Sequence, residues 1–430
     1  MRGGSDEVKA LPPDAILVHI GMHKTGTTTM QSLFGAKRSE LGQFGITYPG
    51  KVDSHHTAAN SLVGRPIARS ASGPVPPDIR RWQRVVHEAR ASAGRVVVSS
   101  EFLSHATDEQ AQQLVADLGS DRVHVIVGIR NLAPLALSAW QQDLKLGKTK
   151  DVDRWLTDFL RREDGAGKQG RFWTLHDPIA AVPRWARAAG PGGLTVLVID
   201  EADRTLLPRT FEQLLELPPG MLSDSRARMS NRSMTAAEAE MVRQVNVGVR
   251  HKISSLEYVA LMRYGAIRRL VETRASTAGE ARIEVPAWVV EIAAEEGRKL
   301  AAATLESGAR IVGSLDSLTA APAGDGTGQP RAVDAVPLRA AVEAIVGAIG
   351  GATGRSWSLD KSPRGDGGGS GLPARFRPSA PGPATARRPP AKPRRVALSL
   401  DTVPTRSLVK ALGARVKAAV RRRVRSLVHR

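Results

Sequence analysis

The sequence predicts an α/β fold with a central parallel sheet and flanking helices. From residue 15 to about residue 318, short runs rich in Val and Ile alternate with longer amphipathic stretches, which is typical of βαβ units. The first apolar run passes through a glycine turn directly into a helical pattern. The chain has 430 residues, 41% of them hydrophobic, so it can bury the core of one large domain and still leave an appendage.

Four apolar runs are predicted to be strands, and a helical pattern follows each of them. They are AILVHI at 15–20, RVVVSS at 95–100, RVHVIVGI at 122–129 and LTVLVI at 194–199. Helices are expected at about 27–38, 108–118, 132–146, 177–189, 235–249, 254–274 and 286–307, with one more at 335–349. Thr235 and Glu238 have the spacing of a capping box, in which each side chain satisfies an early helix amide.

The chain is expected to divide into a folded body and a basic tail. Residues 1–14 form an N-terminal extension, 15–318 the α/β domain and 319–350 an extension rich in Ala and Gly. Residues 351–397 hold Gly, Pro, Ser and Arg with few aliphatic residues, so we expect a disordered linker. Residues 398–430 are predicted to contain a basic amphipathic helix. Its apolar residues recur at steps of mostly four: Leu408, Leu412, Val416, Val420, Val424 and Leu427.

The net charge of +20 lies mainly in this tail. Residues 361–430 hold 18 Lys or Arg, and their only acidic residues are Asp366 and Asp401. The body is therefore only mildly basic, which fits an enzyme with phosphate-bearing ligands and predicts no specific recognition of nucleic acid. The tail is either a solvated basic segment or a contact for an anionic membrane or another polyanion.

The composition also excludes several classes of chemistry. Because the chain has no cysteine, disulfides, thiolate metal sites and cysteine nucleophiles are excluded. The run at 15–20 is too short for the core of a signal peptide, and no run reaches the length of a membrane span. We expect a cytoplasmic protein, with peripheral membrane attachment through the C-terminal helix as an extension of that prediction. His19 and His23 have no partners at metal-ligand spacing, so no metal is predicted.

The segment HIGMHKTGTTTMQ at 19–31 predicts a phosphate-binding turn between a strand and a helix. Such a turn directs several backbone N–H groups and a helix N-terminus at one point, and Lys24 adds a positive charge. A Walker A loop has Lys directly after its second Gly. Here Thr27 follows Gly26 and Lys24 precedes it by two, which disfavours ATPase or kinase chemistry of that type. The alternative is an ordinary turn whose hydroxyls cap the helix.

A second phosphate-binding pattern follows the strand at 122–129. Arg130 stands at its end, and Ser138 lies eight residues later on the next helix. Such an Arg can bind a phosphate bidentately, and the Ser can add a hydroxyl. The alternative is a solvent-facing Arg and a Ser on a helix surface.

The two patterns together resemble the sulfotransferases. The run from Lys24 to Thr28 resembles that family's 5'-phosphosulfate loop, usually written PKSGTT, and Arg130 with Ser138 resembles its 3'-phosphate motif. The resemblance implies a P-loop nucleotide-kinase-like sulfotransferase fold over about 15–318, with 3'-phosphoadenosine 5'-phosphosulfate (PAPS) as cosubstrate and no metal. Its implied cofactor-binding residues are His23, Lys24, Thr25, Gly26, Thr27, Thr28, Arg130 and Ser138. Lys24 matches the loop lysine that contacts the bridging oxygen and the sulfuryl group.

The resemblance also indicates a general base. Glu101 follows the strand at 95–100, where cytosolic sulfotransferases carry a strand ending with their catalytic histidine, and the heparan sulfate sulfotransferases use a glutamate. Glu101 is therefore the candidate that accepts the acceptor's proton. The alternatives are that Glu101 only pairs with Lys24 or Arg130, or that His55 or His56 is the base.

Two further residues are assigned by analogy alone. Asn231 and Arg232 lie where many sulfotransferases bring a loop across the adenosine, although the RKGxxGDWK-type segment of the cytosolic enzymes is absent. The implied reaction is sulfuryl transfer to a hydroxyl or amine. The glutamate and the sparse aromatic residues, 4% of the chain, favour a carbohydrate or glycolipid acceptor. The rival hypotheses are a Mg-ATP phosphotransferase and a non-catalytic protein that binds a polyanion or membrane.

Overall fold

The computed structural model describes most of the chain up to Thr353. The described residues are 8–70, 73–161, 170, 172–173, 177–200, 202–223, 232–276, 280–321, 333 and 335–353. The predicted basic helix at 398–430 and all but the first three residues of the predicted linker lie outside them. The chain divides into two compact units: residues 1–252 with 271–341, and residues 253–270 with 342–430.

The first unit contains a six-stranded sheet in which every strand pair is parallel, so the α/β prediction is confirmed. The strand order is β2-β5-β1-β6-β7-β8. The strands are β1 (Ile16–His19), β2 (Ile46–Thr47), β5 (Arg95–Ser99), β6 (Val123–Arg130), β7 (Leu194–Ile199) and β8 (Arg310–Val312). The four predicted strands form the centre of the sheet, and the short β2 and β8 form its edges.

Successive residues of the central strands enter two different cores. Leu17 of β1 packs in one cluster, and its neighbours Ile16 and Val18 pack in the other. Because side chains alternate along a strand and both faces are covered, the strands read as continuous apolar runs.

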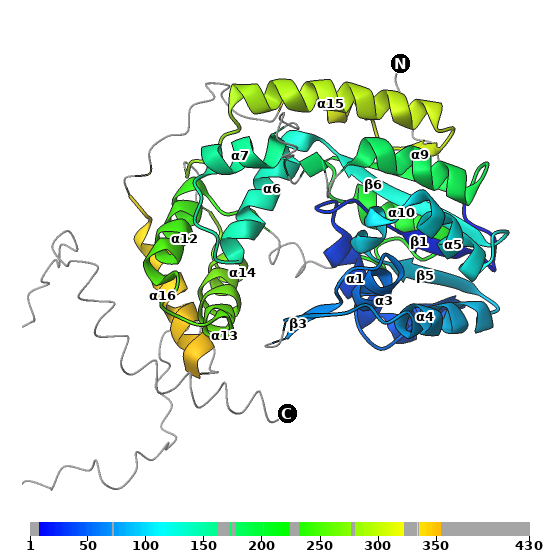
Figure 1. The fold of residues 1–430 in the computed structure, drawn as a ribbon, viewed down its shortest axis with the longest axis horizontal. Helices are drawn as coiled ribbons and strands as arrows, with labels where there is room; N and C mark the ends of the chain where they lie inside the picture. Colours follow the sequence, from blue (N-terminus) through cyan, green and yellow to red (C-terminus); the bar gives the residue numbers. More distant parts are fainter. Residues whose placement is uncertain are drawn as a thin grey trace, which may run out of the picture. The chain divides into compact units, whose positions relative to one another are not determined.

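Helices from separate parts of the chain cover the two faces. The Leu17 face is covered by α1 (Thr27–Ala36), α2 (Arg38–Gln43) and α10 (Leu206–Leu215). The opposite core includes α3 (His56–Leu62), α4 (Arg80–Ala91), α5 (Asp108–Leu118), α9 (Pro178–Ala189) and α15 (Ala287–Glu306). Figure 1 shows α15 lying along α9, and the two helices are in contact.

A further group of helices is centred on α6 (Leu132–Lys145), which contacts α7 (Val152–Leu160), α12 (Ala236–Val249) and α15. The capping box of α12 is confirmed, because Thr235 and Glu238 make both of its hydrogen bonds. The 3-10 helices η1 (Glu101–His105) and η3 (Leu315–Leu318) and an antiparallel pair, β3 (Ala68–Ser70) with β4 (Gly73–Val75), complete this unit.

The helix predicted at 254–274 is continuous, but it changes from an α-helix to a π-helix and back along its length. It runs through α13 (Ser255–Tyr258), the π-helix η2 (Val259–Ile267) and α14 (Arg268–Thr273). Within the second unit, η2 approaches α16 (Leu338–Thr353) so closely that a Cβ on Gly347 would lie 2.5 Å from the Gly265 carbonyl oxygen. An ion pair of 2.6 Å between Arg269 and Glu343 supports this contact. Across all the described residues, no helix combines the length and apolar character that crossing a membrane requires.

Candidate functional site

The strand order creates a switch point between β1 and β6. The chain leaves β1 toward β2 on one side of the sheet, and it leaves β6 toward β7 on the other side. In an open parallel sheet, connections that diverge in this way leave a crevice at the carboxyl ends of the two strands. The predicted phosphate turn follows β1, and Arg130 ends β6, so the fold brings both sequence patterns to this point.

The turn after β1 has a backbone that few sequences can adopt. Gly26 has φ +86°, and a Cβ on Gly21 would lie 2.5 Å from the Thr27 hydroxyl oxygen, so both positions require glycine. Lys24 has φ +70°, an uncommon and strained conformation for a residue with a side chain. The Met22 N–H donates to the Gly128 carbonyl at 3.0 Å and ties the turn to β6.

Several donors at the start of α1 are left unpaired. Within the described part of the chain, the N–H groups of Gly26, Thr27 and Thr28 meet no acceptor, and no side chain caps the helix. The Thr27 hydroxyl is buried and has no hydrogen-bond partner there either. The Thr25 hydroxyl donates to the Met22 carbonyl at 2.6 Å and not to the helix. Hydroxyl capping therefore does not explain the threonines, and the unpaired donors suit an anion.

The Lys24 amine contacts α6. Its Nζ donates to Gln142 Oε1 at 3.3 Å. Burial, and next the nearby charge of Lys145, lowers the pKa of Lys24 to about 8. The predicted Ser138, Gln142 and Lys145 are spaced as i, i+4 and i+7, so they share one face of the helix. The sequence patterns did not identify Gln142 or Lys145.

Arg130 connects the two predicted motifs directly. Its Nη1 donates to the Lys24 carbonyl at 2.8 Å, so the second phosphate pattern holds the strained residue of the first. Ser138 is half-buried, and its hydroxyl makes no hydrogen bond to any described residue. Both residues stay predictions as ligands of a 3'-phosphate.

Glu101 is the first residue of η1, directly after β5 and its cap Ser100. One carboxylate oxygen, Oε2, accepts from Gln31 Nε2 at 3.1 Å and lies 3.7 Å from His56 Nδ1. The other oxygen, Oε1, has no hydrogen-bond partner among the described residues. Glu101 also makes no ion pair with Lys24 or Arg130 in that part of the chain, so simple pairing with those cations does not explain it.

The two adjacent histidines have different surroundings. His55 is buried, its Nδ1 accepts from the Ser99 N–H at 3.0 Å, and its Nε2 lies 2.9 Å from the Pro49 carbonyl oxygen. Burial lowers its pKa, and with both ring nitrogens occupied it is poorly placed to act as a base. His56 contacts Ser100 Oγ at 3.1 Å and lies beside Glu101.

His23 lies in the turn, and its side chain contacts η1. Its Nε2 lies 3.0 Å from His105 Nε2 at the end of η1, and its ring contacts the Phe102 ring edge to face. Burial first, and then the charge of His105, lowers the pKa of His23 to about 4. The side chain therefore faces η1.

The structure does not bring Arg232 to the turn. Its guanidinium binds both carboxylate oxygens of Glu238, at 2.7 and 2.8 Å, at the start of α12. Arg274 binds the same fully buried carboxylate. Asn231 lies outside the described residues. The predicted contact of these two residues with adenosine stays a prediction.

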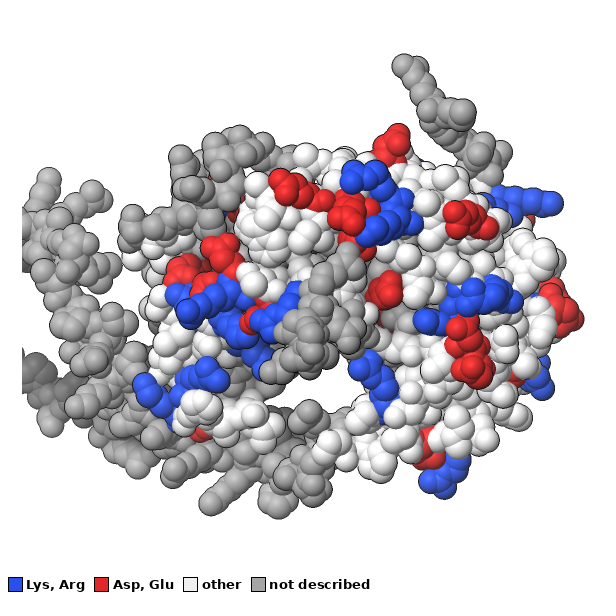
Figure 2. Space-filling model, turned by 45° about the horizontal axis from the view of Figure 1, so that its top comes forward, with Lys and Arg blue, Asp and Glu red and all other residues white. Residues whose placement is uncertain are grey.

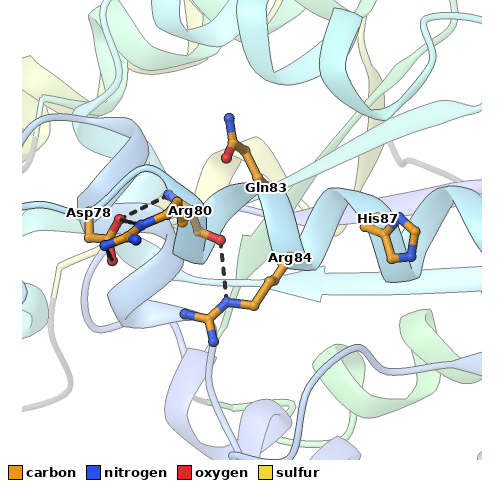
Figure 3. A pocket seen from close by; sticks show the side chains of 5 residues that line it. All are labelled: Asp78, Arg80, Gln83, Arg84 and His87. Carbon is orange, nitrogen blue, oxygen red and sulfur yellow. Dashed lines mark hydrogen bonds and ion pairs between the residues drawn. The ribbon is translucent and has the colours of Figure 1, made fainter.

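Two surface hollows lie away from the turn. One, shown in Figure 3, lies on the exposed side of α4, where Arg80 pairs with Asp78 at 2.9 Å and Arg84 donates to the Arg80 carbonyl. The other is a cavity of about 520 Å³ at the amino ends of the strands, lined in part by Lys9, Arg95 and Arg310. The face in Figure 2 carries Lys and Arg interspersed with Asp and Glu, with no continuous field of one sign among the residues described. In the described ranges, no cluster of three or more His, Asp or Glu could hold a metal ion.

Comparisons with models of protein families, with curated proteins and with solved structures found no match. The function must therefore be inferred from the chemistry of the site. The relevant features are the unpaired donors of the turn, the lysine with a lowered pKa, Arg130 and the open oxygen of Glu101.

Proposed function

We propose that this protein is a sulfotransferase, which moves a sulfuryl group from PAPS to a hydroxyl or amine of an acceptor. The observation that carries the proposal is the junction at the switch point. There Arg130, at the end of β6, donates to the carbonyl of Lys24 in the turn after β1. Two anion-binding elements on adjacent strands suit a nucleotide with a phosphate at each end.

In this proposal, each end of the nucleotide has its own donors. The N–H groups of Gly26, Thr27 and Thr28, the Thr27 hydroxyl and Lys24 hold the 5'-phosphosulfate. Arg130 and Ser138 hold the 3'-phosphate. The buried Thr27 hydroxyl supports this arrangement, because a buried hydroxyl without a partner costs about 1–3 kcal/mol unless a ligand pairs with it.

The reaction is a direct in-line transfer. The acceptor oxygen or nitrogen attacks sulfur and forms the new bond, while the bond from sulfur to the bridging phosphate oxygen breaks and 3'-phosphoadenosine 5'-phosphate (PAP) leaves. Glu101 Oε1 accepts the acceptor's proton, and Gln31 holds the other carboxylate oxygen in place. Lys24 and the turn amides stabilise the charge on the bridging oxygen. The pKa of Lys24, about 8, keeps it protonated at neutral pH and makes its proton easier to donate.

The acceptor and the tail complete the proposal. The acceptor is a carbohydrate or glycolipid, and the basic segment at 398–430 contacts an anionic membrane or another polyanion. Both points rest on the sequence. A non-catalytic binding protein would instead lose its function when residues 351–430 are deleted, and Lys24→Ala would have no effect.

The first experiment is calorimetric binding of PAP without Mg²⁺, with ATP as competitor. We expect PAP to bind the wild type without metal and in preference to ATP. Lys24→Ala and Arg130→Ala should each weaken binding at least about tenfold, since hydrogen bonds to charged groups contribute about 1.5–3 kcal/mol. Arg80→Ala, an exposed arginine on α4, is the matched control and should bind normally. Failure to bind PAP, or binding of ATP only with Mg²⁺, would overturn the proposal.

A further inference from the structure

The cavity at the amino ends of the strands lies far from the phosphate turn. His124 lines it near the start of β6, and Arg130 ends the same strand six residues later. At about 3.3 Å per residue, the cavity and the switch point are roughly 20 Å apart. The volume of the cavity, about 520 Å³, is in the range of sites that bind small molecules. The proposed reaction does not use this cavity.

The charges that line this cavity do not balance. Arg95 and Glu216 pair with each other, whereas Lys9 and Arg310 leave an excess of positive charge. The Lys9 amine makes no hydrogen bond or ion pair with any described residue. Arg310 uses only Nη1 within the same part of the chain, and this atom donates to the Lys9 carbonyl at 3.1 Å. Two cations that border one cavity repel each other, and an anion between them attracts both.

His124 adds a hydrogen-bond donor to the cavity. Its Nε2 lies 2.8 Å from the hydroxyl oxygen of Thr195, which is fully buried. Among the described residues, this hydroxyl has no other hydrogen-bond partner. It therefore donates its single proton to Nε2, since a buried donor without an acceptor is unfavourable. Burial lowers the pKa of His124 to about 4, so the ring is neutral at pH 7 and carries its own proton on Nδ1.

We propose that this cavity binds a small organic molecule through its phosphate group. The donors are the Lys9 amine, the Arg310 guanidinium and the Nδ1–H of His124, which meets no acceptor in the described ranges. An ammonium and a guanidinium are the side chains that proteins use most for phosphate, and the guanidinium can bind two of its oxygens. A phosphate monoester carries a charge of about −2 at neutral pH, which matches the two unpaired cations.

The rest of the lining favours an organic phosphate over a metal ion. Leu11, Pro12 and Pro13 also line the cavity and give the organic part an apolar surface. Divalent cations need several oxygen ligands. The one carboxylate in the lining, that of Glu216, is already paired with Arg95. This inference is independent of the proposed function.

The test follows the His124 ring by NMR, because this ring lines the cavity and lies far from the turn. His124→Gln identifies its signals. A long-range proton–nitrogen spectrum of the unliganded protein should show the proton on Nδ1. Glucose 6-phosphate, inorganic phosphate and glucose are the three probes. We expect glucose 6-phosphate to shift the ring signals at the lowest concentration, inorganic phosphate to shift them at a higher one, and glucose to have no effect.

Lys9→Gln should raise the midpoint of the glucose 6-phosphate titration about tenfold, since the lost hydrogen bond is to a charged group. The exposed arginine Arg84 of α4 provides the matched control, and Arg84→Gln should leave the midpoint unchanged. Thermal unfolding of the unliganded Lys9→Gln variant at the wild-type temperature shows that it is folded.

The titration should also be the same in Lys24→Ala, which separates this cavity from the turn. A proton on Nε2, no shift with either phosphate, an equal midpoint in Lys9→Gln or a changed one in Lys24→Ala would each overturn the site. Because PAP takes no part in this test, its result leaves the proposed function to the calorimetric experiment.

Discussion

The two ends of the parallel sheet differ in how fully their polar groups are paired by hydrogen bonds. At the amino end, Arg95 is buried, and each of its guanidinium nitrogens donates to a carbonyl, including those of Leu11 and Leu215. Its Nη2 also pairs with Glu216. Nearby, His124 Nε2 lies 2.8 Å from the Thr195 hydroxyl. These polar groups find their partners within the chain.

At the carboxyl end, several donors lack such partners, and one residue has a strained backbone. The Thr27 hydroxyl and the first amides of α1 are unpaired among the described residues, and Lys24 has a positive φ. Strain and unsatisfied donors persist in a fold where another requirement outweighs their cost in stability. The comparison teaches that the buried polar groups of the amino end are paired for folding, whereas the unpaired groups of the carboxyl end are those that the proposed function assigns to a ligand.

The largest effect that tests this contrast is expected for Arg95→Met. It leaves several carbonyls without donors, so we expect the free energy of unfolding to fall by about 3 kcal/mol. Urea denaturation measures the loss. The affinity for PAP in the folded fraction should not change, and a large loss of that affinity would contradict the division between the two ends.

Acid should destabilise both ends of the sheet, because each end buries a neutral histidine. Burial lowers the pKa of His19 to about 3 and that of His124 to about 4. The unfolded chain takes up protons first, so stability is complete above pH 6.5 and is lost as the pH falls toward these values. Each histidine should cost about 2 kcal/mol between pH 7 and pH 5. Urea denaturation of His19→Gln and His124→Gln at both pH values should show a smaller pH dependence, whereas exposed His87→Gln should match the wild type.

A matched pair of threonines sharpens the contrast within one turn. Thr25→Val removes a satisfied hydroxyl and should destabilise the protein by about 1 kcal/mol. Thr27→Val removes an unpaired buried hydroxyl, so stability should stay the same or rise, while PAP affinity falls about tenfold. Thermal unfolding and calorimetry measure the two quantities. Equal destabilisation by both changes would mean that the Thr27 hydroxyl has a structural partner.

The smallest expected effect on stability comes from Lys24→Gly. Glycine accepts φ +70° without the steric cost of a side chain, although it loses more entropy on folding. We therefore expect a gain of up to about 1 kcal/mol in thermal unfolding, together with weaker PAP binding. Lys24→Ala keeps the strain and serves as the control. A loss of stability in Lys24→Gly would show that the Gln142 contact outweighs the strain.

The sequence predicted the fold best where a local pattern decides the structure. The central strands are runs of β-branched residues, and α5 begins and ends at the predicted residues 108 and 118. The edge strands β2 and β8 were missed because two or three residues give no periodicity. Helices α4, α7 and α10 were also missed. Charged residues dominate α4, and α10 contains Pro208.

The residues of the candidate site also divide into those that a local pattern predicted and those that only packing brings together. The turn and Arg130 were found because they lie next to strands and have characteristic spacing. Gln142 and His105 were missed because their contacts with Lys24 and His23 depend on how α6 and η1 pack. His55 looked equivalent to His56 in the sequence, and only the Ser99 and Pro49 contacts separate them.

The bond from Arg130 to the Lys24 carbonyl has a consequence for substrate discrimination. In the proposed function, one guanidinium serves both a 3'-phosphate and the backbone of the residue that acts on the sulfuryl group. Recognition at one end of the nucleotide is then thermodynamically linked to the geometry at the other end. A sulfuryl-donor nucleotide that lacks the 3'-phosphate would lose turnover as well as affinity. The enzyme would then discriminate against it during the chemical step and not only on binding.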